Sequence, residues 1–298
     1  MLSRIRGGPQ GLGRIEALAF DGRYLYTYSY DSHTLESFDL EGRSRWRIDG
    51  SAPGTQPVGN ASDLELDARG QLWVVDSKYQ RVNVYSSDGT LLRSIQGPRS
   101  VQRVAPVTNG GYWLFTPVDT TPSLYSESGR RLVHLILSKA IEGADFVARD
   151  PSLTPVAGGG MLITYRWSDR FVVVGPVASR WREFRAVDQR EFPHDDRHAR
   201  SFNGMQIVQL SIDPAAPVAA LSSDVDDGVL YDLFGVGAHG PDQTFGTIDT
   251  YDINTGRYSG SYRLPSEAEA IRVRGVLFAA IVPGPPSSIV VWKWAPAH

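Results

Sequence analysis

The sequence predicts an all-β fold, and three observations indicate it. Short apolar runs recur along the chain, and clusters of turn residues separate them. The 298 residues include 30 glycines and 19 prolines, which suits a fold with many tight turns. No run has a convincing helical period, and residues 138–143 could form at most one helical turn. Because large β folds of this length are often one domain, we expect residues 1–298 to form a single domain.

Residues 61–96 show the structural unit most clearly. Strand patterns alternate with turn signals in this segment, and the strands are predicted at 64–66, 72–75, 82–85 and 91–95. This order describes a four-stranded antiparallel sheet. The segment resembles an NHL repeat in its strand ending in Val-Asp-Ser, its Arg-Val-x-Val strand and the Asp-Gly that follows. The resemblance implies a blade of a β-propeller, and it can be traced in residues 15–50 and 101–137.

Glycines between the third and fourth strands give the repeat length. Gly42, Gly89 and Gly129 lie 47 and 40 residues apart, and propeller blades contain roughly 40 to 50 residues each. An aromatic residue precedes each glycine by four positions, namely Phe38, Tyr85 and Tyr125. We expect each aromatic ring to fill the gap between two neighbouring sheets.

Counting the predicted strands gives six blades. The first three span residues 15–50, 61–96 and 101–137, the fourth has strands at 161–165, 171–174 and 181–184, and the fifth has strands at 229–234, 247–253 and 258–264. The last blade has only three predicted strands before the chain ends, at 271–273, 276–282 and 289–294. Residues Leu2 to Arg6 match the end of a blade without the strands that should precede them. The sequence therefore predicts a six-bladed β-propeller of four-stranded antiparallel blades, whose last blade is closed by the N-terminal strand, so that no sheet edge is left open there.

The composition of the chain limits its classes of partner, its chemistry and its cellular location. The net charge is −3 and the pI is about 6.1, which argues against a nucleic-acid partner bound through phosphate contacts. The chain has no cysteine, which excludes disulfides and thiolate chemistry. No run approaches the roughly 20 apolar residues of a membrane-spanning helix. We expect a cytoplasmic or cytoplasmic-side peripheral protein if Met1 is native, and an extracytoplasmic one if an upstream signal was removed.

Acidic residues in the clearest repeat have two interpretations. Propeller hydrolases hold calcium with carboxylates around the central channel, and Glu65, Asp67 and Asp76 could do so here. The favoured interpretation is structural: NHL repeats use an Asp and an Arg to bridge a turn, so Asp76 and Arg81 are predicted to pair. Copper- or zinc-using NHL lyases have Asn-His-Arg at this turn, whereas this chain has Tyr79-Gln80-Arg81, so their histidine ligand is missing.

Two other polar clusters match no known ligand motif. Residues 192–198 contain two histidines and two aspartates, but their spacing fits no zinc motif, and we interpret them as a polar loop. Asp224, Asp226 and Asp227 lack the spacing and closing glutamate of a calcium loop, and we interpret them as a turn. We predict no catalytic residue, no metal site and no cofactor.

Irregular insertions indicate one elaborated face. They span residues 117–122, 186–203, 235–246 and 283–288, and by the predicted strand order they are turns between second and third strands or connections between blades. These two loop classes share one face of a propeller, and loops grouped on a rigid scaffold commonly bind partners, although drift in loop length explains them equally well. The candidate partner-binding residues are Phe192, His194, Arg197, Phe202, His239 and Phe245.

Two functional classes remain open. The absence of a catalytic set favours a non-enzymatic scaffold that binds a protein partner, for example a membrane-extrinsic subunit of a respiratory or photosynthetic complex. The alternative is a calcium-dependent hydrolase or lactonase that resembles six-bladed propeller enzymes. A deep acidic channel would support the enzyme, whereas a closed channel with a large contact face would support the scaffold. The fold alone decides neither.

Overall fold

The structure is a computed structural model. It describes residues 1–6, 12–50, 58–108, 110–119, 121–142, 144, 150–176, 180–187, 195–202, 205–212, 218–234 and 245–293. For residues 140, 142, 195–202, 205–212 and 245 only the backbone is described.

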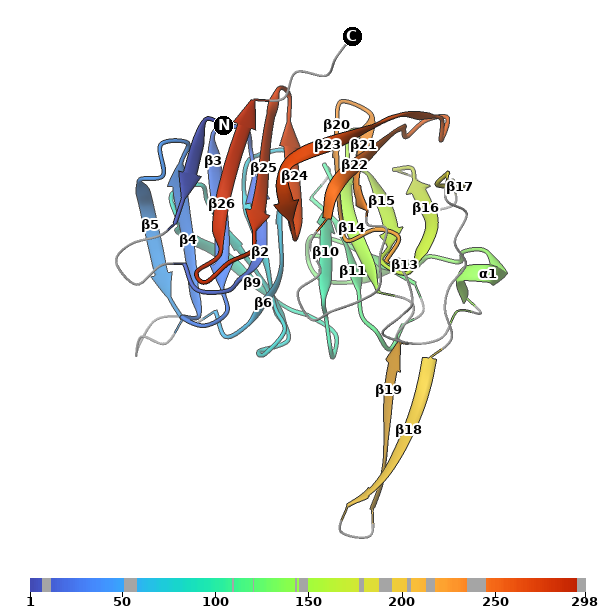
Figure 1. Cartoon of the computed structure of the whole chain (residues 1–298). Helices are drawn as coiled ribbons and strands as arrows, with labels where there is room; N and C mark the ends of the chain where they lie inside the picture. The colour runs from blue at the N-terminus through green and yellow to red at the C-terminus, as the bar shows by residue number, and fades with distance from the viewer. Residues whose placement is uncertain are drawn as a thin grey trace.

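The described strands form six four-stranded antiparallel sheets, which are the blades of a propeller (Figure 1). The inner strand of each blade contacts the inner strands of both neighbours, so the six blades form a closed ring. Blade 1 contains β2 (Ile15–Phe20), β3 (Tyr24–Ser29), β4 (Thr34–Asp39) and β5 (Ser44–Asp49). Blade 2 contains β6 (Ala61–Leu66), β7 (Leu72–Asp76), β8 (Arg81–Tyr85) and β9 (Leu91–Gln96).

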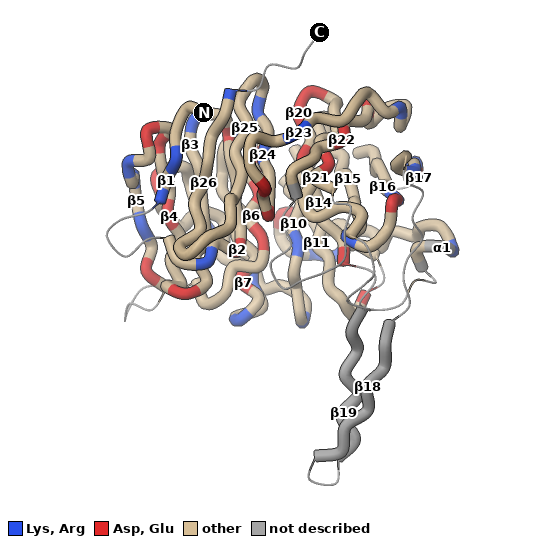
Figure 2. The backbone as a smooth tube through the Cα atoms, in the orientation of Figure 1, with Lys and Arg blue, Asp and Glu red and all other residues tan. Residues whose placement is uncertain are grey.

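The other blades repeat this order, and Figure 2 traces the same strands as a backbone tube. Blade 3 contains β10 (Arg103–Pro106), β11 (Tyr112–Phe115), β12 (Ser123–Tyr125) and β13 (Arg131–His134). A short helix, α1 (Lys139–Glu142), follows. Blade 4 contains β14 (Pro151–Val156), β15 (Gly160–Tyr165), β16 (Ser168–Val174) and β17 (Trp181–Arg185). Blade 5 contains β20 (Ser222–Asp226), β21 (Val229–Phe234), β22 (Phe245–Asp252) and β23 (Tyr258–Ala268).

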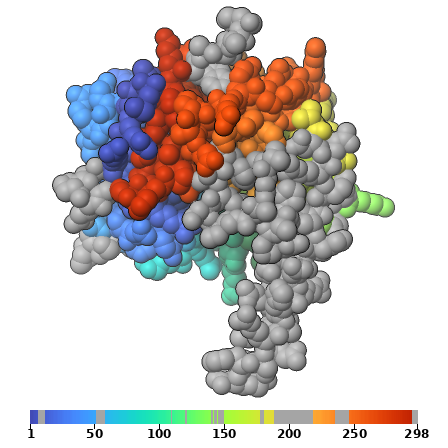
Figure 3. Space-filling model, in the orientation of Figure 1, coloured from blue at the N-terminus to red at the C-terminus, as the bar shows by residue number. Residues whose placement is uncertain are grey.

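Both ends of the chain build the last blade, as the sequence predicts. Blade 6 contains β24 (Ala270–Arg274), β25 (Leu277–Val282), β26 (Ser288–Lys293) and β1 (Ser3–Ile5). Strand β1 pairs antiparallel with β26, so that Ser3 lies opposite Val291 and Ile5 opposite Ile289. Figure 3 shows the N-terminal segment, in dark blue, against the C-terminal strands, in red.

The core lies between the blades. Buried apolar residues form six clusters, and each cluster joins two successive blades. Phe38, Tyr85 and Tyr251 are almost completely buried in these clusters, and Tyr125 stacks on Tyr112 with 5.7 Å between ring centroids. The aromatic residues before the turn glycines therefore fill the gaps between sheets, as expected.

The turn glycines are needed for this packing. Gly89 has a φ of 86°, a conformation that other residues rarely adopt, and a Cβ there would lie 2.7 Å from the Trp46 ring of blade 1. Gly256 repeats the contact, with φ of 71°, against Phe184 of blade 4. Each turn thus rests on the outer strand of the preceding blade.

Two strands lie where the sequence predicts a loop and a turn, and two more lie where it predicts no strand. The segment 195–202 forms β18 (Asp195–Phe202), which pairs with β19 (Met205–Ile212) in a separate two-stranded sheet between blades 4 and 5 (Figure 1). Asp224 and Asp226 lie in the inner strand β20, whereas Asp227 lies in the turn that follows. The inner strand of blade 4, β14, had no counterpart in the predicted strands.

Candidate functional site

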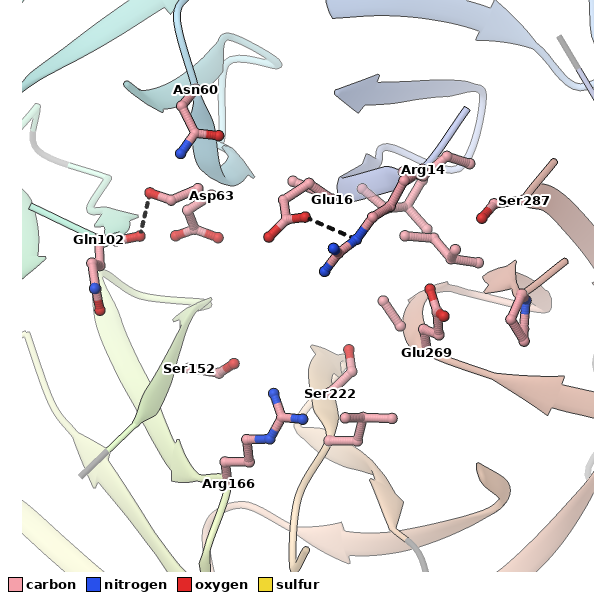
Figure 4. Close-up of a pocket in the computed structure, with 18 of the residues that line it drawn as sticks. Arg14, Glu16, Asn60, Asp63, Gln102, Ser152, Arg166, Ser222, Glu269 and Ser287 are labelled. Carbon is pink, nitrogen blue, oxygen red and sulfur yellow. Dashed lines mark hydrogen bonds and ion pairs between the residues drawn. The ribbon is translucent and has the colours of Figure 1, made fainter. Parts of the chain in front are cut away.

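A cavity of about 1580 Å³ hollows the ring at one end of its axis (Figure 4). Its walls come from the first residues of the inner strands and from the turns between second and third strands of the blades. All six blades contribute to the lining. This end of the ring is also the face of the blade-to-blade connections, so the cavity opens on the face that the sequence identifies as elaborated.

Charged side chains of both signs line the mouth. Arg14 Nε lies 3.6 Å from Glu16 Oε2, and both side chains project into the cavity (Figure 4). The backbone N–H of Arg14 donates to Asp31 Oδ2 at 2.8 Å. On the opposite wall, the Arg166 guanidinium points toward the central space (Figure 4) and lies 5.4 Å from the ring centroid of Trp167.

Arg103 ties three blades together in the wall. Its Nη1 donates to the carbonyl oxygen of Ser62 in blade 2 at 3.2 Å, and its Nε donates to that of Pro151 in blade 4 at 3.2 Å. Its Nη2 lies 3.4 Å from Asp150 Oδ1. The guanidinium is therefore held in one orientation by the fold.

Below the cavity lies a group that we call the floor cluster: Asp63, Glu65, Asp224, Arg272 and Arg274. Arg272 Nη2 donates to Glu65 Oε1 at 3.2 Å, and Arg274 Nη1 donates to Asp224 Oδ2 at 2.7 Å. Glu65 belongs to blade 2 and Arg272 to blade 6, and these blades are separated by blade 1. Their contact therefore spans the central channel past blade 1.

The floor cluster closes the inner end of the cavity. The lining reaches inward as far as Leu18, Asp63 and Arg272. Beyond them, the side chains of Glu65 and Asp224 are only 5% and 1% exposed. The cavity is therefore a cup that opens on one face.

Burial raises the pKa of two carboxyls of the floor cluster, Glu65 and Asp63. Burial raises the pKa of Glu65 to about 8, the charge of Arg272 opposes this shift, and the nearby Asp63 reinforces it. Burial also raises the pKa of Asp63, although its Oδ2 accepts a hydrogen bond from the backbone N–H of Val104 at 2.9 Å. A protonated Glu65 still accepts the Arg272 hydrogen bond through its carbonyl oxygen.

The three acidic residues considered as calcium ligands do not converge. Glu65 belongs to the floor cluster, whereas Asp67 lies in the turn at the other end of its strand, where its carboxylate accepts the N–H groups of Arg69 and Gln71 and the indole N–H of Trp73. Among the residues that the structure describes, no group of three His, Cys, Asp or Glu side chains could hold a metal ion.

Asp76 and Arg81 lie opposite each other across the turn between β7 and β8. Arg81 Nη2 is 3.5 Å from Asp76 Oδ2. The buried carboxylate also accepts the backbone N–H groups of Gly59 at 3.1 Å and Asn60 at 3.3 Å. Asp76 therefore links the turn to the connection that precedes its own blade.

Comparisons with known proteins agree with the architecture. No family model and no curated protein matches the sequence. A streptogramin B lyase structure aligns over 99% of this chain and 87% of its own, with 13% identity and a TM-score of 0.57. Virginiamycin B lyase from Staphylococcus aureus aligns over 96% and 97%, with 11% identity and a TM-score of 0.57. A protein of unknown function from Bacteroides caccae aligns over 84% and 81%, with 15% identity and a TM-score of 0.51.

These likenesses show the fold alone. At such identities, the activity named for the lyases is a property of those proteins. The six-bladed propeller is therefore confirmed, and membership of the NHL-repeat family stays a prediction.

The predicted partner-binding residues remain predictions. Phe192, His194 and His239 lie outside the described residues. Arg197 and Phe202 lie in β18 and Phe245 begins β22, where only the backbone is described. Their segments belong to a connection between blades and to a turn between second and third strands, which are the two loop classes of the cavity face.

Sequence reasoning missed most of the residues that line the cup and its floor. A signal for them exists in the inner strands, where charged residues alternate with apolar ones, as in Asp63-Leu64-Glu65 and Arg272-Val273-Arg274. In an ordinary sheet this alternation indicates a solvent-facing side. In a propeller the same side of the innermost strand faces the channel.

Proposed function

We propose that this propeller is a non-enzymatic scaffold that binds a protein partner on the face where the cup opens. The observation that carries the proposal is the separate sheet of β18 and β19. Among the described strands, β18 and β19 pair with each other and with no strand of a blade. The six blades close the ring without this sheet, so it has no part in ring closure.

A two-stranded sheet suits partner binding. Within the described residues, each of these strands pairs on one side only. An unpaired strand edge offers backbone N–H and C=O groups to a strand of another protein. Because β18 and β19 connect blade 4 to blade 5, they leave the ring at the end where the cup opens. We propose this sheet as the docking element.

The arrangement of charges also favours a scaffold over a calcium-dependent hydrolase. Carboxyl groups of the floor cluster lie against guanidiniums, as in Glu65 with Arg272 and Asp224 with Arg274. A divalent cation would have to displace these arginines from their partners. One concrete form of the proposal is a membrane-extrinsic subunit of a larger assembly. Within the described residues, no helix is long and apolar enough to cross a membrane.

Replacing residues 188–217 with a short Gly-Ser linker tests the proposal. We expect a folded ring by circular dichroism, because the blades hold the ends of the connection in place. Copurification of the partner from source cells, quantified by mass spectrometry, should fall by at least about tenfold if the sheet supplies the main binding energy. Arg69→Ala and Asn254→Ala, in turns of the opposite face, serve as controls.

Two results would contradict the proposal. Undiminished copurification after removal of β18 and β19 would place the binding surface elsewhere. Calcium-dependent hydrolysis of an ester or lactone by the intact chain would replace the scaffold with an enzyme.

A further inference from the structure

The lining of the cup combines polar groups with apolar surface. Some apolar lining residues, such as Ile15 and Leu18, are less than 5% exposed, whereas Trp167 is half-buried and Pro285 and Pro286 are exposed. A lining of this kind favours a ligand that carries both polar groups and apolar C–H surface.

The charges of the cup favour a ligand without net charge. Arg14 lies beside Glu16, and Arg103 beside Asp150. An anion that approaches either guanidinium is repelled by the neighbouring carboxylate, and a cation that approaches either carboxylate is repelled by the neighbouring guanidinium. The Coulomb gain for an ion is therefore small, whereas every one of these groups can still form charge-assisted hydrogen bonds.

Hydroxyl groups match such a lining. A carboxylate only accepts and a guanidinium only donates, but a hydroxyl does both and can bridge the two. Planar amides, Asn60 and Gln102, and the hydroxyls of Ser152, Ser222 and Ser287 complete the polar wall (Figure 4). We propose that the cup binds a neutral oligosaccharide.

Size and shape support a ligand of several sugar rings. Pockets for single small ligands typically enclose about 300 to 1,000 Å³, and the cup encloses about 1580 Å³. Trp167 lies in the wall of blade 4 and is half-buried, with the Arg166 guanidinium 5.4 Å from its ring centroid. The exposed part of its indole ring would pack against the C–H groups of a sugar ring. The polar residues around it would then bind the hydroxyls.

Isothermal titration calorimetry on the full chain tests the inference. The probes are maltohexaose, cellohexaose, xylohexaose and laminarihexaose, with hexagalacturonate as an anionic probe and a chitosan hexamer as a cationic probe. We expect at least one neutral hexamer to bind with a Kd below about 1 mM. Its affinity should change less than about twofold between 50 and 500 mM NaCl, because salt screens only interactions between charges.

Substitutions locate the bound sugar. Gln102→Ala and Trp167→Ala should each weaken binding by about tenfold, because a buried hydrogen bond or stacked ring is lost. Trp167→Phe should retain most of the affinity, since it keeps an aromatic face. Gln71→Ala, which changes the same side chain in a turn of the opposite face, should leave affinity unchanged. Circular dichroism and melting temperature establish that each variant is folded.

Three outcomes would overturn the inference. In the first, none of the neutral hexamers binds. In the second, a charged probe binds more tightly than the neutral hexamers and its affinity depends strongly on salt. In the third, a neutral hexamer binds, but neither Gln102→Ala nor Trp167→Ala weakens its binding. A fourth outcome would assign the cup to protein recognition. In that case a synthetic peptide of the copurified partner binds the wild type, and Trp167→Ala abolishes this binding. None of these results bears on the docking role of β18 and β19, which the linker variant tests separately.

Discussion

At the scale of single residues, turn glycines couple neighbouring blades. Gly89 requires both a positive φ and the absence of a Cβ against Trp46, whereas Gly70 has φ of 72° with nothing within 4 Å of a Cβ. Comparing the two glycines therefore distinguishes the cost of a positive φ from the cost of placing a Cβ against the neighbouring blade.

We predict that Gly70→Ala lowers the free energy of unfolding by about 1 kcal/mol, the cost of a left-handed conformation for a residue with a Cβ. Gly89→Ala should cost more, about 2 to 4 kcal/mol, because the added methyl group also displaces the Trp46 ring. Urea denaturation of both variants measures the difference. Equal losses would show that the contact between blades 1 and 2 tolerates the methyl group.

A second feature at this scale is a pair of buried carboxyls in blade 5. Asp232 on β21 lies directly opposite Asp249 on β22, and they are only 7% and 4% exposed. Tyr251 donates its hydroxyl to Asp249 at 3.4 Å, and Ser261 also donates to Asp249. In the described part of the chain, Asp232 Oδ1 has no hydrogen-bond partner. Burial, followed by the charge of Asp249, raises the pKa of Asp232 well above its usual range.

This raised pKa predicts a stability that falls as pH rises. The unfolded Asp232 loses its proton near pH 4, while the folded protein retains it, so the stabilisation is complete below about pH 4 and is lost as pH rises through the folded pKa. Asp232→Asn should therefore melt at the same temperature as the wild type near pH 4 and at a higher temperature near pH 8. Calorimetry across this range measures the difference.

Asp88→Asn provides a control in which the pH dependence of stability has the opposite sign. Hydrogen bonds from Ser86 and Thr90 lower the pKa of Asp88, so its contribution is lost as pH falls. A pH-independent difference between Asp232→Asn and the wild type would mean that Asp232 is ionised in the folded protein.

At the scale of elements, the sequence predicts strands best where turns and apolar runs agree, as in β6 to β9. Strand β14 escapes prediction because it contains Pro151 and Pro155, which are tolerated because the innermost strand leaves one edge unpaired. Strand β20 escapes because Ser222 and Asp224 are buried and accept the N–H groups of Ile271 and Val273 in the next blade. Local patterns do not reveal such partners, which lie 49 residues away.

The shortest strand supports a prediction at the same scale. Deleting Met1 to Gly8 removes β1, which exposes the edge of β26 with its apolar Ile289 and Val291. We expect aggregation and a lower melting temperature, because an unpaired apolar edge pairs with other chains. Size-exclusion chromatography and thermal denaturation measure both. A monomer with an unchanged melting temperature would show that blade 6 is stable with three strands.

At the scale of the whole molecule, the floor cluster is a cross-brace. Contacts between successive blades can be inferred from a repeat, but the sequence gives no sign that Glu65 meets Arg272, which is 207 residues away. The cup and its closed end follow from ring geometry, in which six inner strands converge on one axis. For this reason the sequence could predict the fold but not the cup.

Substitutions test this brace. Glu65→Leu should lower the free energy of unfolding by about 1 to 3 kcal/mol, because the buried Arg272 guanidinium loses a hydrogen-bond partner. Glu65→Leu combined with Arg272→Met should restore most of that loss, because the Arg272 guanidinium is then no longer left without the Glu65 carboxyl. Urea denaturation of both single variants and the double variant gives the coupling energy. Strictly additive losses would show that the two residues stabilise the ring independently.

Pairing of β1 with β26 has a consequence for synthesis on the ribosome. Ser3 to Ile5 must wait for Ile289 to Val291 before they find their partners. At about 5 to 20 residues per second, that delay is roughly 15 to 60 s. During this time five blades can assemble in order, but β26 has not yet been synthesised, so the ring stays open and β1 stays unpaired. A chaperone that shields β1 on the nascent chain would therefore act longer on this strand than on the strands of the first five blades.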